Sequence, residues 1–190
     1  MRNIILASGS KARRDLLRQM GIKFRVARSN IRESRTLSRG CGSLVEGNAL
    51  RKARDVAPGF SSGVIIAADT VVLVGKRIIG KPADLSDARR TLKLLSRRPQ
   101  WVYTGLAVID IDGGKEYLAH ERTKVWMREL SDSQIDRYFS KVSPLDKAGS
   151  FDIQGRGGLF IDRIEGCFYN VVGLPLAKLS NMLAKAGVEL

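Results

Sequence analysis

Hydrophobic and polar positions along the chain follow two spacings, which predict strands and helices in turn. Runs of β-branched and aromatic residues bounded by Gly, Ser, Asp or Pro are typical of strands. Apolar residues three and four positions apart, ending near Gly or Pro, indicate helices. We therefore expect strands over Asn3–Ala7, Ile22–Ala27, Val64–Val74, Arg77–Ile79, Trp101–Ile111, Lys115–Met127, Leu159–Ile164 and Phe168–Val172. We expect helices over Lys11–Met20, Ser43–Ala57 and Ser86–Ser96, from the Ser131 capping box to about Val142, and from Pro175 to Gly187.

The alternation of strands and helices is typical of an α/β fold, but hairpins interrupt it. We therefore expect a central mixed, twisted sheet flanked by helices rather than an all-parallel one. The length fits one domain, and no repeat or low-complexity linker divides it. We expect a single domain over residues 1–190, with two lobes around a cleft. Residues 28–41 and the glycine-rich segment Asp146–Gly158 are predicted loops.

Composition excludes several protein classes. Apolar residues make up 44% of the chain, which is enough for a packed core and too many for a disordered chain. No apolar run approaches the roughly 18 residues of a membrane span, and the N-terminus has too short an apolar core for a secretory signal. Cys41 and Cys167 show neither a disulfide pattern nor metal-ligand spacing. We therefore expect a soluble cytoplasmic protein without a membrane partner.

The chain is basic, and its charge is uneven. It has 33 Lys and Arg against 19 Asp and Glu, and the first 60 residues alone have a net charge of +10. Such a field attracts polyanions: nucleic acid, an anionic membrane or a phosphorylated small molecule. A solubilising surface explains scattered Arg equally well, so the sign of the charge alone chooses no function.

One acid interrupts the most apolar predicted strand. Val64–Val74 has a single charged residue, Asp69, at its centre. An unpaired buried carboxylate is costly, so this group needs a basic partner, a metal ion or exposure at a cleft. Asp is depleted in strands, and perturbed acids cluster at functional sites. Asp69 is therefore a candidate catalytic group, beside the alternative of a partnered structural Asp, and Thr70 adds a hydroxyl next to it.

Several segments have the chemistry of phosphate binding. Ser8-Gly9-Ser10 lies between a predicted strand and a predicted helix, where N–H groups, hydroxyls and the helix dipole favour an anion. Arg13, in the first turn of that helix, is favourable there if an anion lies nearby. Lys52 and Lys81 are further candidate phosphate ligands, and Gln154 can read a base edge. Turn chemistry and solvated side chains explain these residues as well.

Two familiar catalytic motifs are excluded. Gly75 to Pro82 nearly spells a P-loop, but Pro82 stands where the motif has Ser or Thr, and the segment does not run strand–loop–helix. The chain has one His and no clustered Cys, which argues against Ser-His-Asp and Cys-His hydrolases. We give that residue, His120, no role.

A metal-dependent phosphate enzyme needs no His. Carboxylates hold Mg²⁺ while cationic side chains clamp phosphates, and Glu33 and Asp69 are the candidate carboxylates. The competing class, a nucleic-acid-binding module, predicts aromatic residues interleaved with Arg on an exposed surface. Phe24 and Phe60 are the aromatic residues before Val64, so the basic first third supports that class weakly.

Taken together, the motifs resemble those of the Maf family of nucleoside triphosphate pyrophosphatases over nearly the full length. Many short motifs in one order make this resemblance specific. The matching segments are Ile5-Leu6-Ala7-Ser8-Gly9-Ser10 with Arg13 and Leu16-Leu17, Ala49 to Ala53, Ala68-Asp69-Thr70-Val71-Val72, Gly80-Lys81-Pro82, Tyr103-Thr104-Gly105, Asp146-Lys147-Ala148-Gly149, Ile153-Gln154-Gly155 and Tyr169 to Pro175.

The resemblance implies a two-lobed fold with a cleft, similar to the inosine-triphosphate pyrophosphatase architecture. It implies hydrolysis of a nucleoside triphosphate to the monophosphate and pyrophosphate, with a divalent cation (Mg, Mn or Co) as cofactor. It also implies that Asp69 is the general base, that Glu33 binds the metal or orients the water, and that Asp69 is a second metal ligand. The implied triphosphate clamp consists of Ser8, Ser10, Arg13, Lys52 and Lys81.

Three positions bear on the nucleobase. Thr70 and Gln154 fall where the family branch acting on dTTP and UTP has Thr and Gln, whereas the 7-methyl-GTP branch more usually has Gln and Glu. Ala12 stands where the pyrimidine branch has an Arg associated with substrate choice. We expect dTTP, UTP or related modified pyrimidine nucleotides as substrates. The alternatives are 7-methyl-GTP or another modified purine nucleotide, and a basic nucleic-acid-binding module without catalysis.

The resemblance also has biological implications. Members of the family are linked to cleansing the nucleotide pool and to cell-division arrest, including septum formation. The expected partner is the nucleoside triphosphate, and we do not expect nucleic acid to bind. Whether the protein forms a homodimer is left open.

Overall fold

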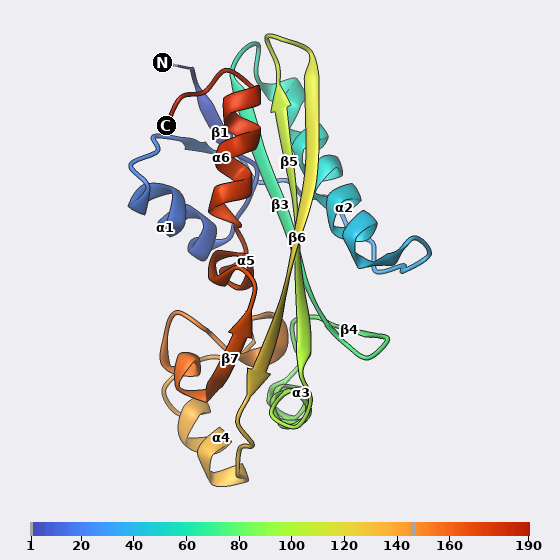
Figure 1. The fold of residues 1–190 in the computed structure, drawn as a ribbon, viewed down its shortest axis with the longest axis vertical. Coiled ribbons are helices and arrows are strands. Elements are labelled where there is room, and N and C mark those ends of the chain that lie inside the picture. Colours follow the sequence, from blue (N-terminus) through green and yellow to red (C-terminus); the bar gives the residue numbers. More distant parts are fainter. Residues whose placement is uncertain (1, 146) are drawn as a thin grey trace. The chain divides into compact units, whose positions relative to one another are not determined.

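Figure 1 shows the computed structural model, which describes residues 2–145 and 147–190. Asp146, which begins a predicted loop and one matching segment, lies outside the described residues. The strands are β1 (Ile4–Leu6), β2 (Arg25–Val26), β3 (Val64–Val74), β4 (Arg77–Ile79), β5 (Gln100–Asp110), β6 (Lys115–Met127) and β7 (Ile161–Glu165). The helices are α1 (Lys11–Gln19), α2 (Gly40–Val56), α3 (Leu85–Leu95), α4 (Asp132–Phe139), α5 (Phe168–Val172) and α6 (Leu176–Lys185), with 3-10 turns at Ala57–Gly59, Ala148–Ser150 and Arg156–Phe160.

The strands form one mixed sheet in the order β2-β1-β3-β5-β6-β7, and β4 pairs with β3. β1 is parallel to β2 and β3. β4 is antiparallel to β3, and β7 is antiparallel to β6. The predicted α/β class with a mixed sheet flanked by helices is therefore confirmed.

The chain forms two compact units. The first comprises residues 1–70, 103–121 and 169–190, and the second comprises residues 71–102 and 122–168. β3, β5 and β6 contribute residues to both units.

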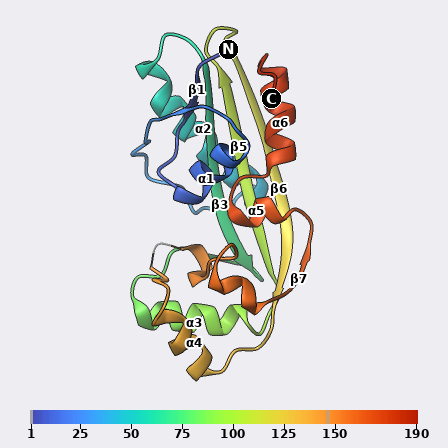
Figure 2. The same ribbon diagram turned by 90° about the vertical axis from the view of Figure 1, so that its left-hand side faces the viewer.

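The first unit has a hydrophobic core on each face of β3, because successive strand side chains point to opposite faces. Ile66 packs in one core with Leu16 of α1 and with residues of α6. Ile65 packs in the other core with Ala53 of α2. α2 and α6 accordingly lie on opposite sides of β3 in both ribbon views (Figures 1 and 2).

In the second unit, buried side chains come from α3, α4, the ends of the strands and the connecting segments that hold Leu130, Phe151 and Phe160. Leu92 of α3 and Ile135 of α4 are fully buried. The ring of Tyr138 meets that of Phe160 edge to face, with centroids 5.0 Å apart, a favourable aromatic geometry.

One predicted strand is wrong: Phe168–Val172 is helix α5. The adjacent Val residues favour a strand locally, but the hydrogen bonds at the end of the segment fix a helical turn. The N–H of Leu174 donates to Tyr169 at 2.9 Å, and Gly173 has a φ of 111°, a glycine-terminated end that satisfies helical carbonyls. Thr104 also donates to the carbonyl of Asn170 at 3.0 Å, so a tertiary contact supports the same conformation.

Other boundaries differ less. The predicted strand Ile22–Ala27 shortens to β2, and α2 begins at Gly40, before the predicted Ser43. The predicted glycine-rich loop contains two 3-10 turns. In the described part of the chain, no helix combines the length and apolar character needed to cross a membrane.

Candidate active site

The acid predicted to be functional lies on β3 between two strand pairings. β1 pairs with β3 up to Leu6 and Ile66, and β4 pairs with it from Val72 onward. Asp69 falls between these registers, beyond the carboxyl end of the parallel strand β1. Open α/β sheets form ligand sites at the carboxyl ends of their strands.

Asp69 is buried, with 3% of its surface exposed, yet both of its carboxylate oxygens are bonded. Lys52 donates to Oδ1 at 2.6 Å, and Asn48 donates to Oδ2 at 2.8 Å. Burial raises the pKa of Asp69, but the charge of Lys52, the hydrogen bonds from Lys52 and Asn48 and the charge of Arg13 outweigh it. The pKa therefore lies below its ordinary value, and the carboxylate is ionised at neutral pH.

Lys52 joins two carboxylates. Its Nζ lies 2.6 Å from Glu33 Oε1 and 2.6 Å from Asp69 Oδ1. The side chain of Lys52 is 12% exposed and that of Glu33 is 51% exposed. The ammonium group therefore links a solvent-facing carboxylate to a buried one, and the structure brings together two predicted acids and one predicted phosphate ligand.

Asn48 is a candidate that the sequence analysis missed. It precedes Lys52 by four residues, so both side chains lie on one face of α2. Its Nδ2 also donates to the carbonyl of Ser34 at 3.0 Å, while Oδ1 accepts from the Ser34 N–H at 2.9 Å and from Arg51 at 2.8 Å. The signal available in the sequence was a polar residue four positions before Lys52, among the apolar residues of a predicted helix.

Arg13 is buried and directs its guanidinium into the protein. It donates to the hydroxyls of Ser8 (3.2 Å) and Thr70 (2.9 Å) and to the carbonyls of Ala68 (2.9 Å) and Gly173 (2.8 Å). Arg13 thus ties the loop after β1 to the strand residues on either side of Asp69.

Thr70 belongs to the same network. Besides accepting from Arg13, its Oγ1 lies 2.9 Å from Oγ1 of Thr104, which donates to the carbonyl of Asn170. The hydroxyl of Thr70 therefore orients Arg13 as well as being a predicted substrate contact.

The Ser8–Ser10 loop begins α1 as predicted. Ser8 Oγ accepts from the N–H of Ser10 at 3.2 Å, and Ser10 Oγ accepts from the N–H of Arg13 at 3.4 Å. A Cβ on Gly9 would lie 3.4 Å from Nε of Arg28, so that guanidinium lies over the loop. Hydroxyls, a helix N-terminus and a cation favour an anion at this position, and Arg28 is another residue that the sequence analysis missed.

The remaining two predicted residues, Lys81 and Gln154, lie in the second unit, and both are exposed. Lys81 follows Gly80, whose carbonyl accepts from the N–H of Gly149 at 3.3 Å. The N–H of Gln154 donates to Asp152 Oδ1 at 3.0 Å. The predicted residues that the first unit holds are Ser8, Ser10, Arg13, Glu33, Lys52, Asp69 and Thr70.

The carboxylates suit a metal ion that arrives with substrate. Within residues 2–145 and 147–190, no group of three or more His, Cys, Asp and Glu side chains is placed to hold a metal. Mg²⁺, however, commonly binds to one or two carboxylates together with substrate phosphates. Glu33 and Asp69 are hard oxygen donors that already share a cation, so this donor set fits that mode.

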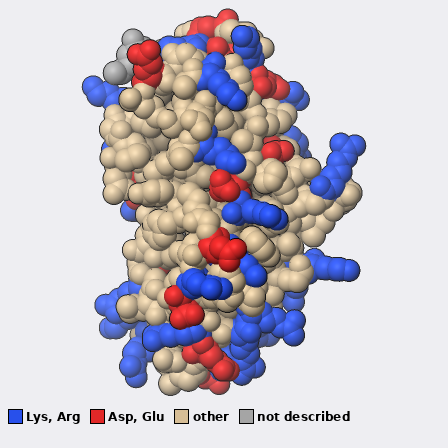
Figure 3. All heavy atoms as spheres, viewed as in Figure 1, with Lys and Arg blue, Asp and Glu red and all other residues tan. Residues whose placement is uncertain are grey.

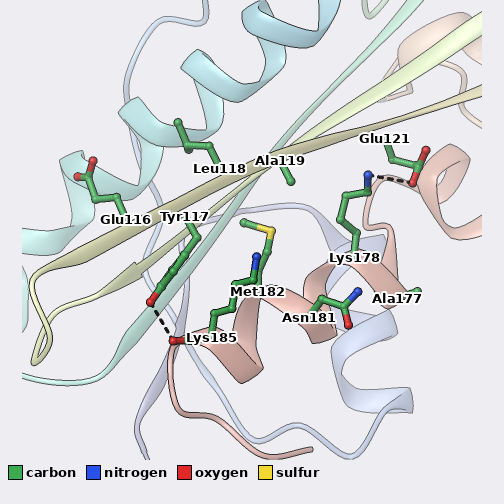
Figure 4. Close-up of a pocket in the computed structure, with 10 residues that line it drawn as sticks. All are labelled: Glu116, Tyr117, Leu118, Ala119, Glu121, Ala177, Lys178, Asn181, Met182 and Lys185. Carbon is green, nitrogen blue, oxygen red and sulfur yellow. Dashed lines mark hydrogen bonds and ion pairs between the residues drawn. The ribbon is translucent and has the colours of Figure 1, made fainter.

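The first unit has one surface hollow next to Glu33 and another between β6 and α6. Residues 31–36 line a hollow of about 620 Å³. Another hollow, of about 570 Å³, lies between β6 and α6, where Tyr117 donates to the carbonyl of Lys185 and Lys178 pairs with Glu121 (Figure 4). None of the predicted site residues lines this second hollow. The hollow at Glu33 therefore adjoins the candidate site.

Comparison with known proteins places this chain in a family. The model of the family described as Maf-like protein matches residues 3–186. The dTTP/UTP pyrophosphatase of Methanosarcina barkeri is 46% identical over 100% of this chain and 97% of its own length. Those of Methanosarcina mazei and Bacillus anthracis are 47% and 41% identical, over 100% of this chain and 96% and 98% of theirs.

The fold also has a more distant likeness. The structure of the Staphylococcus aureus Ham1 protein is 16% identical, with a TM-score of 0.53 over 95% of this chain and 100% of that chain. This likeness concerns the fold alone. On the family match and the full-length relatives, the chain belongs to the Maf-like protein family.

Proposed function

We propose that the protein hydrolyses nucleoside triphosphates to nucleoside monophosphates and pyrophosphate. The observation that carries this proposal is the pair Asp69 and Glu33, joined by Lys52 beside a loop of hydroxyls and Arg side chains. Relatives that match the whole chain at 41–47% identity are named dTTP/UTP pyrophosphatases, and this name describes the same kind of reaction.

In the proposed reaction, a water molecule attacks the α-phosphorus and gives its proton to Asp69. The bond from the α-phosphorus to the oxygen of the β-phosphate breaks, and pyrophosphate leaves with that bonding pair. In the free protein, the ammonium group of Lys52 forms an ion pair with Asp69 and stabilises its negative charge. A bound triphosphate offers competing anionic oxygens to Lys52, and loss of that ion pair raises the basicity of the carboxylate.

A divalent ion held by Glu33 and Asp69 would neutralise charge on the triphosphate and its leaving group. The chain's own cations do the remaining electrostatic work. Lys52 and Lys81 would bind phosphate oxygens, and Ser8, Ser10 and the α1 N-terminus would donate to them. Arg13 orients Ser8 and Thr70 through its hydrogen bonds.

For the nucleobase we propose a pyrimidine, with dTTP and UTP as preferred substrates, because the named relatives act on these nucleotides. Thr70 and Gln154 match the pyrimidine branch, and Ala12 departs from it. Arg28 over Gly9 supplies a cation to the loop that precedes Ala12. The cytoplasmic location and the homodimer stay predictions from the sequence.

One feature supports the alternative of a nucleic-acid-binding module. Trp101 and Trp126, on the sheet of the second unit, alternate with cations, and Arg163 lies 4.0 Å from the centre of the Trp126 ring. These rings are half-buried, and Arg and Lys side chains of the same chain already pack over them, where a nucleic-acid base would have to stack. On the face shown in Figure 3, Lys and Arg lie among Asp and Glu rather than in one basic field. The enzyme proposal is therefore the stronger one.

A nucleotide panel tests the proposal. We expect Mg²⁺-dependent pyrophosphate release from dTTP and UTP, with lower kcat/KM for CTP, dATP and 7-methyl-GTP, and loss of turnover in EDTA. Preference for 7-methyl-GTP would support the purine alternative. Absence of pyrophosphate from every nucleotide, with tight binding of a single-stranded oligonucleotide, would overturn the enzyme proposal.

A further inference from the structure

We infer that Asn48 is a positioning residue, which holds Asp69 and the segment bearing Glu33 against the same face of α2. This inference rests on the proposed function and goes beyond it, because Asn48 touches neither phosphate nor water in the proposed reaction. It acts through the two carboxylates.

The side-chain amide of Asn48 is saturated with partners. Its two Nδ2 hydrogens go to Asp69 Oδ2 and to the carbonyl of Ser34, and its Oδ1 accepts from the Ser34 N–H and from Arg51. An Asn side chain offers two donors and two acceptor sites, so each is used. Rotation of the amide by 180° would oppose donor to donor and acceptor to acceptor. Asn48, which is 1% exposed, is therefore fixed in one orientation.

The first consequence concerns Asp69. Its two oxygens are bonded to side chains four residues apart on α2, with Asn48 on Oδ2 and Lys52 on Oδ1. Two donors from one rigid helix fix the plane of the carboxylate. When Lys52 turns to substrate phosphate, as proposed above, the Asn48 bond is the contact from α2 that keeps the carboxylate aimed.

The second consequence concerns Glu33. Asn48 binds both the N–H and the carbonyl of Ser34, the next residue, as a neighbouring strand would. This docks the segment onto α2 next to Lys52, whose ammonium lies 2.6 Å from Glu33. A side chain that is half exposed and lies in a loop thereby gains a fixed position relative to Asp69.

Two substitutions separate these contacts. Asn48→Leu removes all four hydrogen bonds at similar volume. Asn48→Asp keeps an acceptor for the Ser34 N–H and for Arg51, but it can donate neither to Asp69 nor to the carbonyl of Ser34. It also places a second negative charge beside Asp69. Glu46→Gln is the matched control, since it lies two residues earlier on α2 and its carboxylate bonds instead to His120 at 2.8 Å.

We expect both Asn48 variants to lower kcat for dTTP on the order of 10-fold or more per folded molecule, with KM changed less than about threefold. Amide hydrogen exchange over residues 33–35 should accelerate in Asn48→Leu, and it should accelerate less in Asn48→Asp, which keeps the acceptor for the Ser34 N–H. Glu46→Gln should match wild type in both measurements. A residue with a merely structural role would change the melting temperature but not kcat per folded molecule.

Wild-type-like kcat in both folded Asn48 variants would overturn the inference, and so would unchanged exchange in Asn48→Leu. If Asn48→Asp does not fold, the exchanged pair Asn48→Asp with Asp69→Asn restores a donor facing an acceptor. That double variant should regain melting temperature while staying inactive, and no recovery would count against the contact. Wild-type protein without turnover would refute the proposed function, while the exchange measurement would still test the contact.

Discussion

At the scale of single residues, the candidate site depends on how charge is kept inside the protein. A carboxylate as buried as Asp69 stays ionised because cations and hydrogen-bond donors surround it. Lys52, which compensates for that burial, is also a candidate phosphate ligand. One ion pair therefore serves stability in the free protein and is available to substrate in the reaction.

Asp69→Asn should lower kcat on the order of 10² or more, because an amide cannot accept a proton from water at neutral pH. The substitution keeps the size of the side chain and an oxygen for Lys52, but its amide nitrogen then faces the donating Nδ2 of Asn48. The melting temperature should therefore fall while the protein stays folded. Steady-state pyrophosphate release and a thermal melt check the two halves of this prediction. Near-normal turnover would remove Asp69 from the role of base.

Lys81→Ala should raise KM for dTTP about 10-fold, which corresponds to about 1.4 kcal/mol of lost binding. The reason is loss of a cation from the triphosphate clamp. Lys76→Ala, in the exposed turn between β3 and β4, is the matched control and should have wild-type kinetics. If the two variants behave alike for every nucleotide, Lys81 does not belong to the clamp.

At the scale of elements, α2 is the part of the fold that assembles the site, since Asn48 and Lys52 project from one of its faces. Its distance from the sheet depends on Gly105 of β5. A Cβ there would lie 2.2 Å from the carbonyl carbon of Val45, so the helix backbone packs directly on the strand.

Gly105→Ala should therefore push α2 off the sheet, with a loss of about 1–3 kcal/mol of stability and a fall in kcat. Gly47→Ala makes the same substitution on α2 itself, where no described atom beyond the neighbouring residues and backbone of the helix lies within 4 Å of the added methyl group. It should leave kcat unchanged and raise stability slightly, since Ala is the better helix former. Thermal melts and dTTP turnover, measured for both variants, test this prediction. Equal behaviour would contradict the close packing.

Sequence patterns predict the elements whose signals are local. β3, β4 and β6 match their predicted bounds, because β-branched runs and turn residues define them. α5 was missed because bonds at Gly173 and Thr104 outweigh the propensity of two Val residues. Asp69 stood out as a charge in an apolar strand, whereas Asn48 did not, since its role depends on contacts with Ser34 and Asp69, which only the tertiary structure brings close.

At the scale of the whole molecule, carboxylates are scarce: 19 acids serve 33 basic residues. Some of these carboxylates form ion pairs with basic side chains from distant parts of the sequence. Arg2 bonds to Asp110 at the end of β5 and to Asp112, the latter at 2.5 Å. The hydrogen bond from Arg2 holds the pKa of Asp110 below its ordinary value, although burial opposes the shift.

This ion pair predicts how acid affects stability. A carboxylate whose pKa is lower in the folded state stabilises the fold fully above the ordinary value of about 4. That contribution is lost as the pH falls through the lowered pKa. We expect the melting temperature to drop steeply below about pH 4. Asp110→Asn should melt ~2–4 °C below wild type at pH 7, a shift typical of about 1 kcal/mol at this size. The gap between the two melting curves should narrow as the pH falls through the lowered pKa of Asp110, because wild-type Asp110 also becomes neutral there. A gap that stays constant as acid is added would show that the charge of Asp110 contributes nothing.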